Sequence, residues 1–182
     1  MNGFELSILL WMQENLRGFM DGFWIFITSL ADKGWFWILL AVVLLFFRKT
    51  RVAGVTVLVA LIFNHVMINI LLKDLVARPR PYVASDEIVT LIKQLSSFSF
   101  PSGHTSTSFA AAFAVLFMEK KRRYAIPAMI IAAMIGFSRM YVGVHYPGDI
   151  LGGIVIGILS AFAASAIVKL VRVRLRKKHD KA

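Results

Sequence analysis

The feature that most constrains this chain is a series of apolar runs that approach the length of a membrane span. They cover residues 35–47 (with 20–31 leading in), 52–72, 104–118, 124–143 and 149–171. About 20 apolar residues cross the hydrocarbon core as a helix, and backbone groups in lipid must be hydrogen-bonded internally. The sequence therefore predicts an all-α fold, an integral membrane bundle of about five transmembrane helices.

The composition agrees with a membrane protein. Hydrophobic residues make up 58% and charged residues 17% of the chain, against about 45–50% and about 25% in soluble domains. The chain has no Cys, which excludes thiolate catalysis and Cys-ligated metal centres. No linker or long repeat divides it, so we expect one transmembrane domain over residues 1–182. No convincing metal-ligand cluster is present, and we expect no cofactor.

The net charge of +11 would suggest nucleic acid as a partner if the chain were soluble. However, 14 of the 21 Lys and Arg lie in three clusters that separate or follow the apolar runs. These are Arg48, Lys49 and Arg51; Lys120, Lys121, Arg122 and Arg123; and seven residues from Lys169 to Lys181. Such clusters mark cytoplasmic loops. This predicts a cell-membrane protein with a cytoplasmic basic tail, no nucleic-acid partner, and extracytoplasmic connections at 75–101 and 139–148.

Residues 4–16 are apolar but contain Glu5, Gln13 and Glu14. Thirteen residues are too few to cross the bilayer, so we expect an interfacial helix here. The first residues lack the positive charge and cleavage site of a cleavable signal peptide. By the positive-inside rule, the N-terminus is extracytoplasmic.

Unusual polar residues gather on the two extracytoplasmic connections. Lys73 follows an apolar run, and Arg80 and Pro81 come seven and eight residues later. A Lys at a helix end can simply snorkel, but several cations on the outer side run against the charge rule. They indicate an anionic partner.

The segment Phe100-Pro101-Ser102-Gly103-His104 opens the third apolar run. Ser102 suits a helix N-cap, and the free N–H groups behind it, with Gly103 allowing close approach, can bind an anion. The segment could equally be only a capped helix start.

A third group consists of Ser138-Arg139, His145 and Asp149. Pro147 suits a first helical turn, which places Asp149 within reach of the His145 imidazole. Such a carboxylate can hold one ring nitrogen and leave the other free, as in catalytic base and orienter pairs. A structural His capped by Asp is the alternative, although it leaves Arg139 unexplained.

The predicted topology brings all three groups to one membrane face. Two His, several cations and two helix N-termini at one place suit a phosphate undergoing transfer. In order and spacing the groups resemble the three-part signature of the type 2 phosphatidic acid phosphatase superfamily, which includes lipid phosphatases and vanadium haloperoxidases. The resemblance covers about residues 70–150 and implies a catalytic core like the haloperoxidase helical fold.

The resemblance also implies roles for individual residues. His145 would attack phosphorus and form a phosphohistidine, with Asp149 orienting it, and His104 would protonate the leaving oxygen. Phosphate oxygens would be bound by Lys73, Arg80, Ser102, Gly103 and Arg139. It implies no metal and gives Arg78 no role. A supporting position beneath the site is expected for the polar residues of the second run, Asn64, His65 and Asn69.

The implied function is a phosphatase for a lipid phosphate or diphosphate at the outer face. Undecaprenyl diphosphate is the first expectation, with phosphatidylglycerophosphate and phosphatidate as alternatives. A non-enzymatic protein that binds or transports anionic lipid would need the cations but not the His145–Asp149 pair opposite His104. A haloperoxidase is less favoured, because this chain is embedded in the membrane.

Overall fold

The computed structural model describes residues 3–118, 123 and 125–179, and within them the ordered elements are helical. The predictions made for Lys120, Lys121, Arg122 and Lys181 fall outside these residues. The helices are α1 Gly3–Leu16, α2 Asp21–Ser29, α3 Trp35–Phe46, α4 Arg51–Val66, α5 Lys73–Val76, α6 Pro81–Ala84, α7 Gly103–Met118, α8 Ala125–Tyr141 and α9 Pro147–His179. The expected all-α membrane fold is confirmed.

Among the described residues, length and apolar composition qualify two stretches as membrane spans, Arg51–Ala84 and Pro147–Lys177. A third arises if α2 and the helix that follows it, which meet at an angle of 46°, form one bent span. Helix α8 is apolar but has 17 residues. The total of five spans stays a prediction.

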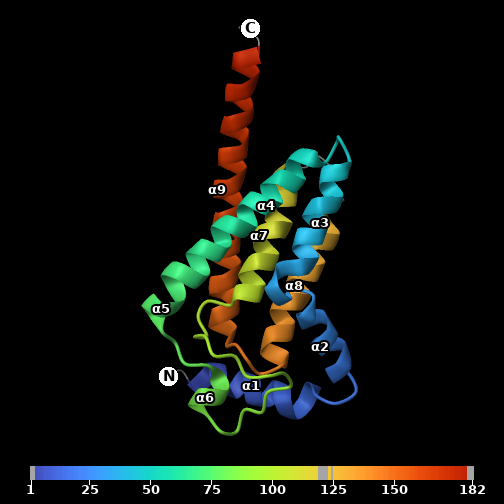
Figure 1. Ribbon diagram of the computed structural model, residues 1–182. Coiled ribbons are helices and arrows are strands. Elements are labelled where there is room, and N and C mark those ends of the chain that lie inside the picture. The colour runs from blue at the N-terminus through green and yellow to red at the C-terminus, as the bar shows by residue number, and fades with distance from the viewer. Residues whose placement is uncertain (1–2, 119–122, 124, 180–182) are drawn as a thin grey trace.

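Helix α7 lies in the middle of the bundle, between α4, α8 and α9 (Figure 1). Its buried residues are small or polar, among them Thr105, Ser106, Ser108, Ala110 and Ala114. A Cβ atom at Gly157 of α9 would stand 2.6 Å from the Ser106 carbonyl oxygen. The α7 and α9 backbones therefore touch, which explains the small residues that the sequence places on both helices.

The first apolar run is broken rather than continuous. A 3-10 turn at Asp32–Gly34 separates α2 from α3, and both Lys33 (φ 52°) and Gly34 (φ 74°) adopt left-handed backbone conformations. A left-handed residue cannot continue an α-helix. Asp32 and Lys33, at this break, are exposed.

Helix α1 lies across one end of the bundle, beneath α8 and α9 (Figure 1). Leu9 and Met12 are buried there, and Gln13 exchanges two hydrogen bonds with the backbone of Glu87 and Val89. This position fits the expected interfacial helix. The turn between α3 and α4, with its basic residues, and the end of α9 lie at the opposite end of the bundle.

Candidate active site

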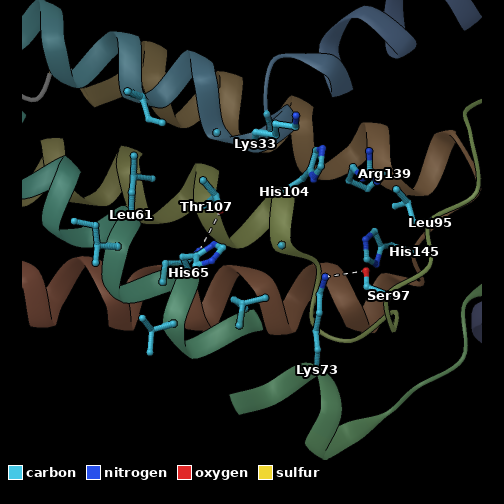
Figure 2. Close-up of a pocket in the computed structure, with 18 of the residues that line it drawn as sticks. Lys33, Leu61, His65, Lys73, Leu95, Ser97, His104, Thr107, Arg139 and His145 are labelled. Atoms are coloured by element: carbon cyan, nitrogen blue, oxygen red, sulfur yellow. Dashed lines mark hydrogen bonds between the residues drawn. The ribbon is translucent and has the colours of Figure 1, made fainter. Parts of the chain in front are cut away.

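A cavity of about 760 Å³ lies at the α1 end of α3, α4, α7 and α8. Its polar wall includes two histidines and three cations of the predicted site, of which Figure 2 labels all but Arg80. These residues are Lys73, Arg80, His104, Arg139 and His145. Its apolar wall comes from α3 and α4, namely Ile38, Leu58, Leu61, Ile62 and Val66. The cavity thus joins a cationic end to an apolar surface.

His145 precedes α9 and is backed by Asp149 in the first turn of that helix, which Pro147 begins. Nδ1 of His145 lies 3.3 Å from Oδ2 of Asp149, and Nε2 lies 3.3 Å from Nη1 of Arg80. Because a guanidinium only donates, Nε2 must accept, which places the ring proton on Nδ1 toward the carboxylate. The Nε2 lone pair is therefore on the cation side of the ring.

The environment keeps His145 neutral. Burial lowers the pKa of this imidazole to about 3, and the positive charges of Arg139 and Arg80 act in the same direction, against the opposing effect of Asp149. A neutral imidazole is the form that can donate an electron pair. The ring is thus suited to nucleophilic attack.

Arg80 is buried and fixed by the loop that precedes α7. Its Nε donates to the Ser97 carbonyl at 2.7 Å, and Nη2 donates to Ser97 Oγ at 3.1 Å and the Phe98 carbonyl at 3.2 Å. Nη1 donates to the Val144 carbonyl at 2.9 Å. These bonds hold the guanidinium beside His145.

Arg139 is 1% exposed, and its Nη1 donates to Thr28 Oγ1 at 2.6 Å. Its Nε and Nη2 have no acceptor within the described part of the chain. Buried, unpaired donors on a cation are costly, so an anion in the cavity would satisfy them. Lys73 reaches the same cavity and donates to Ser97 Oγ at 3.1 Å (Figure 2).

His104 begins α7 and lies opposite His145 in the cavity. Its Nε2 is 2.9 Å from Oδ1 of Asp32, at the break after α2. Gly103 also lines the cavity. The Ser102 side chain is buried and caps α7, accepting from Thr105 Oγ1 at 2.9 Å, and it is not among the lining residues. Its predicted contact with phosphate stays a prediction.

The family model for the PAP2 superfamily matches residues 53–172, which contain all three motif groups. The chain belongs to the PAP2 superfamily. Undecaprenyl-diphosphatase BcrC of Bacillus subtilis is 34% identical over 157 residues, 84% of this chain and 77% of that protein. The PAP2 chain is a lipid phosphatase, which disfavours the alternative of a non-enzymatic lipid-binding protein.

Two solved structures share the fold of the PAP2 chain. The phosphatidylglycerolphosphate phosphatase of Bacillus subtilis superposes with a TM-score of 0.74 at 26% identity, covering 93% of this chain and 86% of its own. Aquifex aeolicus LpxE superposes with a TM-score of 0.76 at 28% identity, covering 87% and 93%. The likeness therefore extends over nearly the whole PAP2 chain, beyond the motif region.

Several residues at the PAP2 site escaped the sequence analysis. Asp32 contacts His104, and Ser97 and Ser99 contact Arg80 and Asp149 respectively. The run Ser96-Ser97-Phe98-Ser99 immediately precedes the second motif, which was the one available signal for the serines. Within the described residues, no group of three or more His, Cys, Asp or Glu could hold a metal ion.

The polar residues of α4 divide between packing and the cavity. Asn64 is buried, donates to Thr107 Oγ1 at 3.2 Å, and accepts from Ser106 and Ser160. It thereby ties α4 to α7 and α9 just beneath the site, a supporting position of the kind expected. His65 lines the cavity.

Proposed function

We propose that this lipid phosphatase cleaves a lipid diphosphate, with undecaprenyl diphosphate as the first candidate, through a phosphohistidine at His145. The observation that carries the proposal is the pairing of a neutral His145, held through Nδ1 by Asp149, with the unpaired donors of Arg139 in one cavity. The first supplies an electron pair and the second supplies sites for phosphate oxygens.

In the first step, Nε2 of His145 forms a bond to phosphorus while the bond from phosphorus to the leaving oxygen breaks. The proton on Nδ1 stays near Asp149, which stabilises the positive ring. His104 donates a proton to the leaving oxygen. In the second step, water attacks phosphorus, loses a proton to His104, and releases inorganic phosphate together with the free imidazole.

The cations neutralise the charge that gathers on the non-bridging oxygens during both steps. Arg139 offers Nε and Nη2, Arg80 lies beside the attacking nitrogen, and Lys73 approaches from the other side. The Gly103 N–H and the Ser102 hydroxyl belong to this group in the proposal. Asp32 holds the His104 ring and stabilises the positive charge it carries before it gives up its proton. The steps as written require no metal.

A polyprenyl diphosphate suits the shape of the cavity, with its phosphates at the cationic end and its chain along the apolar wall of α3 and α4. The similarity to BcrC supports this substrate. Phosphatidylglycerophosphate is the second candidate, because one of the two solved structures with the same fold is a phosphatase of that lipid. Phosphatidate is a further alternative.

The charge distribution supports an extracytoplasmic site. The basic turn between α3 and α4 and the basic end of α9 lie at the bundle end away from the cavity (Figure 1). By the positive-inside rule, that end faces the cytoplasm, so substrate would reach the site from the outer leaflet.

The deciding experiment measures phosphate release by purified protein in detergent with EDTA. The substrates are undecaprenyl diphosphate, phosphatidylglycerophosphate and phosphatidate, and the His145→Ala variant is the control. We expect the highest kcat/KM for the diphosphate and none for the variant. Equal phosphate release by His145→Ala would falsify the phosphohistidine route. A higher kcat/KM for another lipid would make that lipid the proposed substrate instead of undecaprenyl diphosphate.

A further inference from the structure

Glu5, in the first turn of α1, reaches residues far along the chain. Its Oε2 accepts from Nη2 of Arg78 at 2.5 Å, and its Oε1 accepts from the backbone N–H of Gly148 at 2.7 Å. Gly148 lies in the first turn of α9, next to Asp149. A single carboxylate on the peripheral helix thus contacts both an arginine and the start of the helix that carries the predicted orienting residue.

Arg78 connects Glu5 to Asp149. Its Nη1 donates to Oδ1 of Asp149 at 2.7 Å, and its guanidinium lies 4.0 Å above the Tyr146 ring. The guanidinium is therefore fixed by two carboxylates and one aromatic face. These contacts make it a positioning group, and it is not among the residues that line the cavity.

Asp149 is fully buried, so the direction of its carboxylate depends on its partners. Oδ2 faces His145 and accepts from Ser99 Oγ at 2.5 Å and from the Tyr146 N–H at 2.9 Å. Oδ1 is held by Arg78. Without Arg78, one oxygen of a buried carboxylate would lose its charged partner, and the carboxylate could rotate away from the imidazole.

We propose that Glu5 is a positioning residue for catalysis, acting through Arg78 on Asp149 and thereby on His145. Helix α1 then completes the active site instead of only lying on the membrane surface. The inference rests on the proposed function, because it assigns Glu5 an effect on the attacking imidazole.

Helix α1 also packs on the bundle through contacts that do not involve Glu5. The effect of Glu5 on catalysis can therefore be tested apart from the docking of the helix. Leu9 and Met12 bury apolar surface, and Gln13 bonds the loop at Glu87 and Val89. None of these contacts reaches Asp149. A Gln13→Ala variant therefore weakens docking alone, whereas Glu5→Gln keeps an acceptor for Gly148 but removes the charge that holds Arg78.

The first measurement is steady-state hydrolysis of the lipid diphosphate by both variants. Misalignment of a reacting group lowers the rate of the chemical step more than it lowers the affinity for substrate. We expect Glu5→Gln to lower kcat by about tenfold with KM changed less than about twofold. Gln13→Ala should stay within about twofold of wild type in both constants. Equal losses in the two variants would assign Glu5 to docking and overturn the inference.

The second measurement repeats Glu5→Gln in an Asp149→Asn background. If Glu5 acts only through the Asp149 carboxylate, its removal there should change kcat by less than about twofold, because coupled effects do not add. A purely structural role predicts the same tenfold loss in both backgrounds. That result would overturn the proposal even if Glu5→Gln alone is impaired.

Vanadate binding gives a readout that does not require turnover. Vanadate bonded to His145 should depend on ring orientation, so Glu5→Gln should weaken vanadate inhibition by about tenfold while inhibition by phosphate changes little. Unchanged vanadate inhibition would contradict the inference. If Glu5→Gln behaves as wild type but His145→Ala is inactive, the proposed function stands. If His145→Ala remains active, the proposed function itself is wrong.

Discussion

His104 at the start of α7 and Asp32 at the break after α2 lie 2.9 Å apart, measured from Nε2 to Oδ1. The contact depends on the bend in the first apolar run. Lys33 and Gly34 take left-handed conformations, and the resulting turn brings the carboxylate to the His104 ring. An unbroken helix would direct it along the bundle wall instead.

Asp32→Asn should slow hydrolysis of monoesters more than of diphosphates. In the proposed mechanism Asp32 stabilises the protonated His104 that acts as the acid, and an alkoxide leaving group needs a proton more than a phosphate does. We expect kcat to fall about tenfold or more for phosphatidate and only about threefold for the diphosphate. His104→Ala should show the same order. The exposed Asp86 provides the control, since Asp86→Asn should leave both substrates unaffected. A uniform loss would separate Asp32 from proton donation.

Vanadate should inhibit in competition with the lipid substrate. It can become five-coordinate on a ring nitrogen. In the proposed mechanism only His145 supplies that apical bond, whereas Lys73, Arg80 and Arg139 share the remaining oxygens. His145→Ala should therefore lose vanadate binding more completely than any single cation variant. The measurement is isothermal titration of vanadate into each detergent-solubilised protein. Equal affinity in wild type and His145→Ala would mean that another group attacks.

The buried imidazole of His145 should make the protein less stable in acid. Burial lowers its pKa to about 3, while an exposed imidazole titrates at about 6.5. As pH falls below about 6.5, the unfolded chain binds a proton that the folded protein does not, which lowers the free energy of unfolding by roughly 1.4 kcal/mol per pH unit.

Thermal melting at pH 7.5 and pH 5.0 checks this, with His145→Asn as the matched variant. Asn does not titrate, so the variant should lose less of its melting temperature on acidification than wild type. If the two proteins lose the same amount, His145 does not carry the acid sensitivity.

The site could be anticipated where its chemistry follows from short spacing. His145 and Asp149 are four residues apart across a helix start marked by Pro147, and that spacing alone brings the ring near the carboxylate. The small residues Gly153 and Gly157, four positions apart on α9, likewise favour the close contact of α9 with α7 that the structure shows. In both cases the residues lie on α9 or just before it, so their relative positions follow from their spacing in the sequence.

The remaining contacts depend on elements that meet only in the folded chain. Glu5 and Gly148 are 143 positions apart, and Asp32 and His104 are 72 apart. No periodicity relates such residues. Glu5 and Asp32 each stand as ordinary acidic residues in an apolar run, and their roles follow from the crossing of α1 and the break after α2.

Gly157→Ala should destabilise the bundle. The added Cβ would meet the Ser106 carbonyl at 2.6 Å and the Ala110 nitrogen at 2.9 Å, both backbone atoms. Gly152 is the matched control, because the nearest atoms to its Cβ would belong to the Phe100 ring, a side chain that can turn. Overpacking against backbone costs about 1–3 kcal/mol. Melting temperature should fall clearly for Gly157→Ala and less for Gly152→Ala, and the opposite order would contradict rigid α7 and α9 packing.

Membrane sidedness can be tested with single cysteines, since the chain has none. Asp86 lies in the loop before α7 and Lys49 in the turn between α3 and α4, and both are exposed. If the basic end faces the cytoplasm, Asp86→Cys in intact cells should react with a membrane-impermeant maleimide. Lys49→Cys should react only after the cells are opened, which also shows that its thiol is accessible. The reverse pattern would place the cavity at the cytoplasmic face, where a lipid diphosphate released outside could not reach it without first crossing the bilayer.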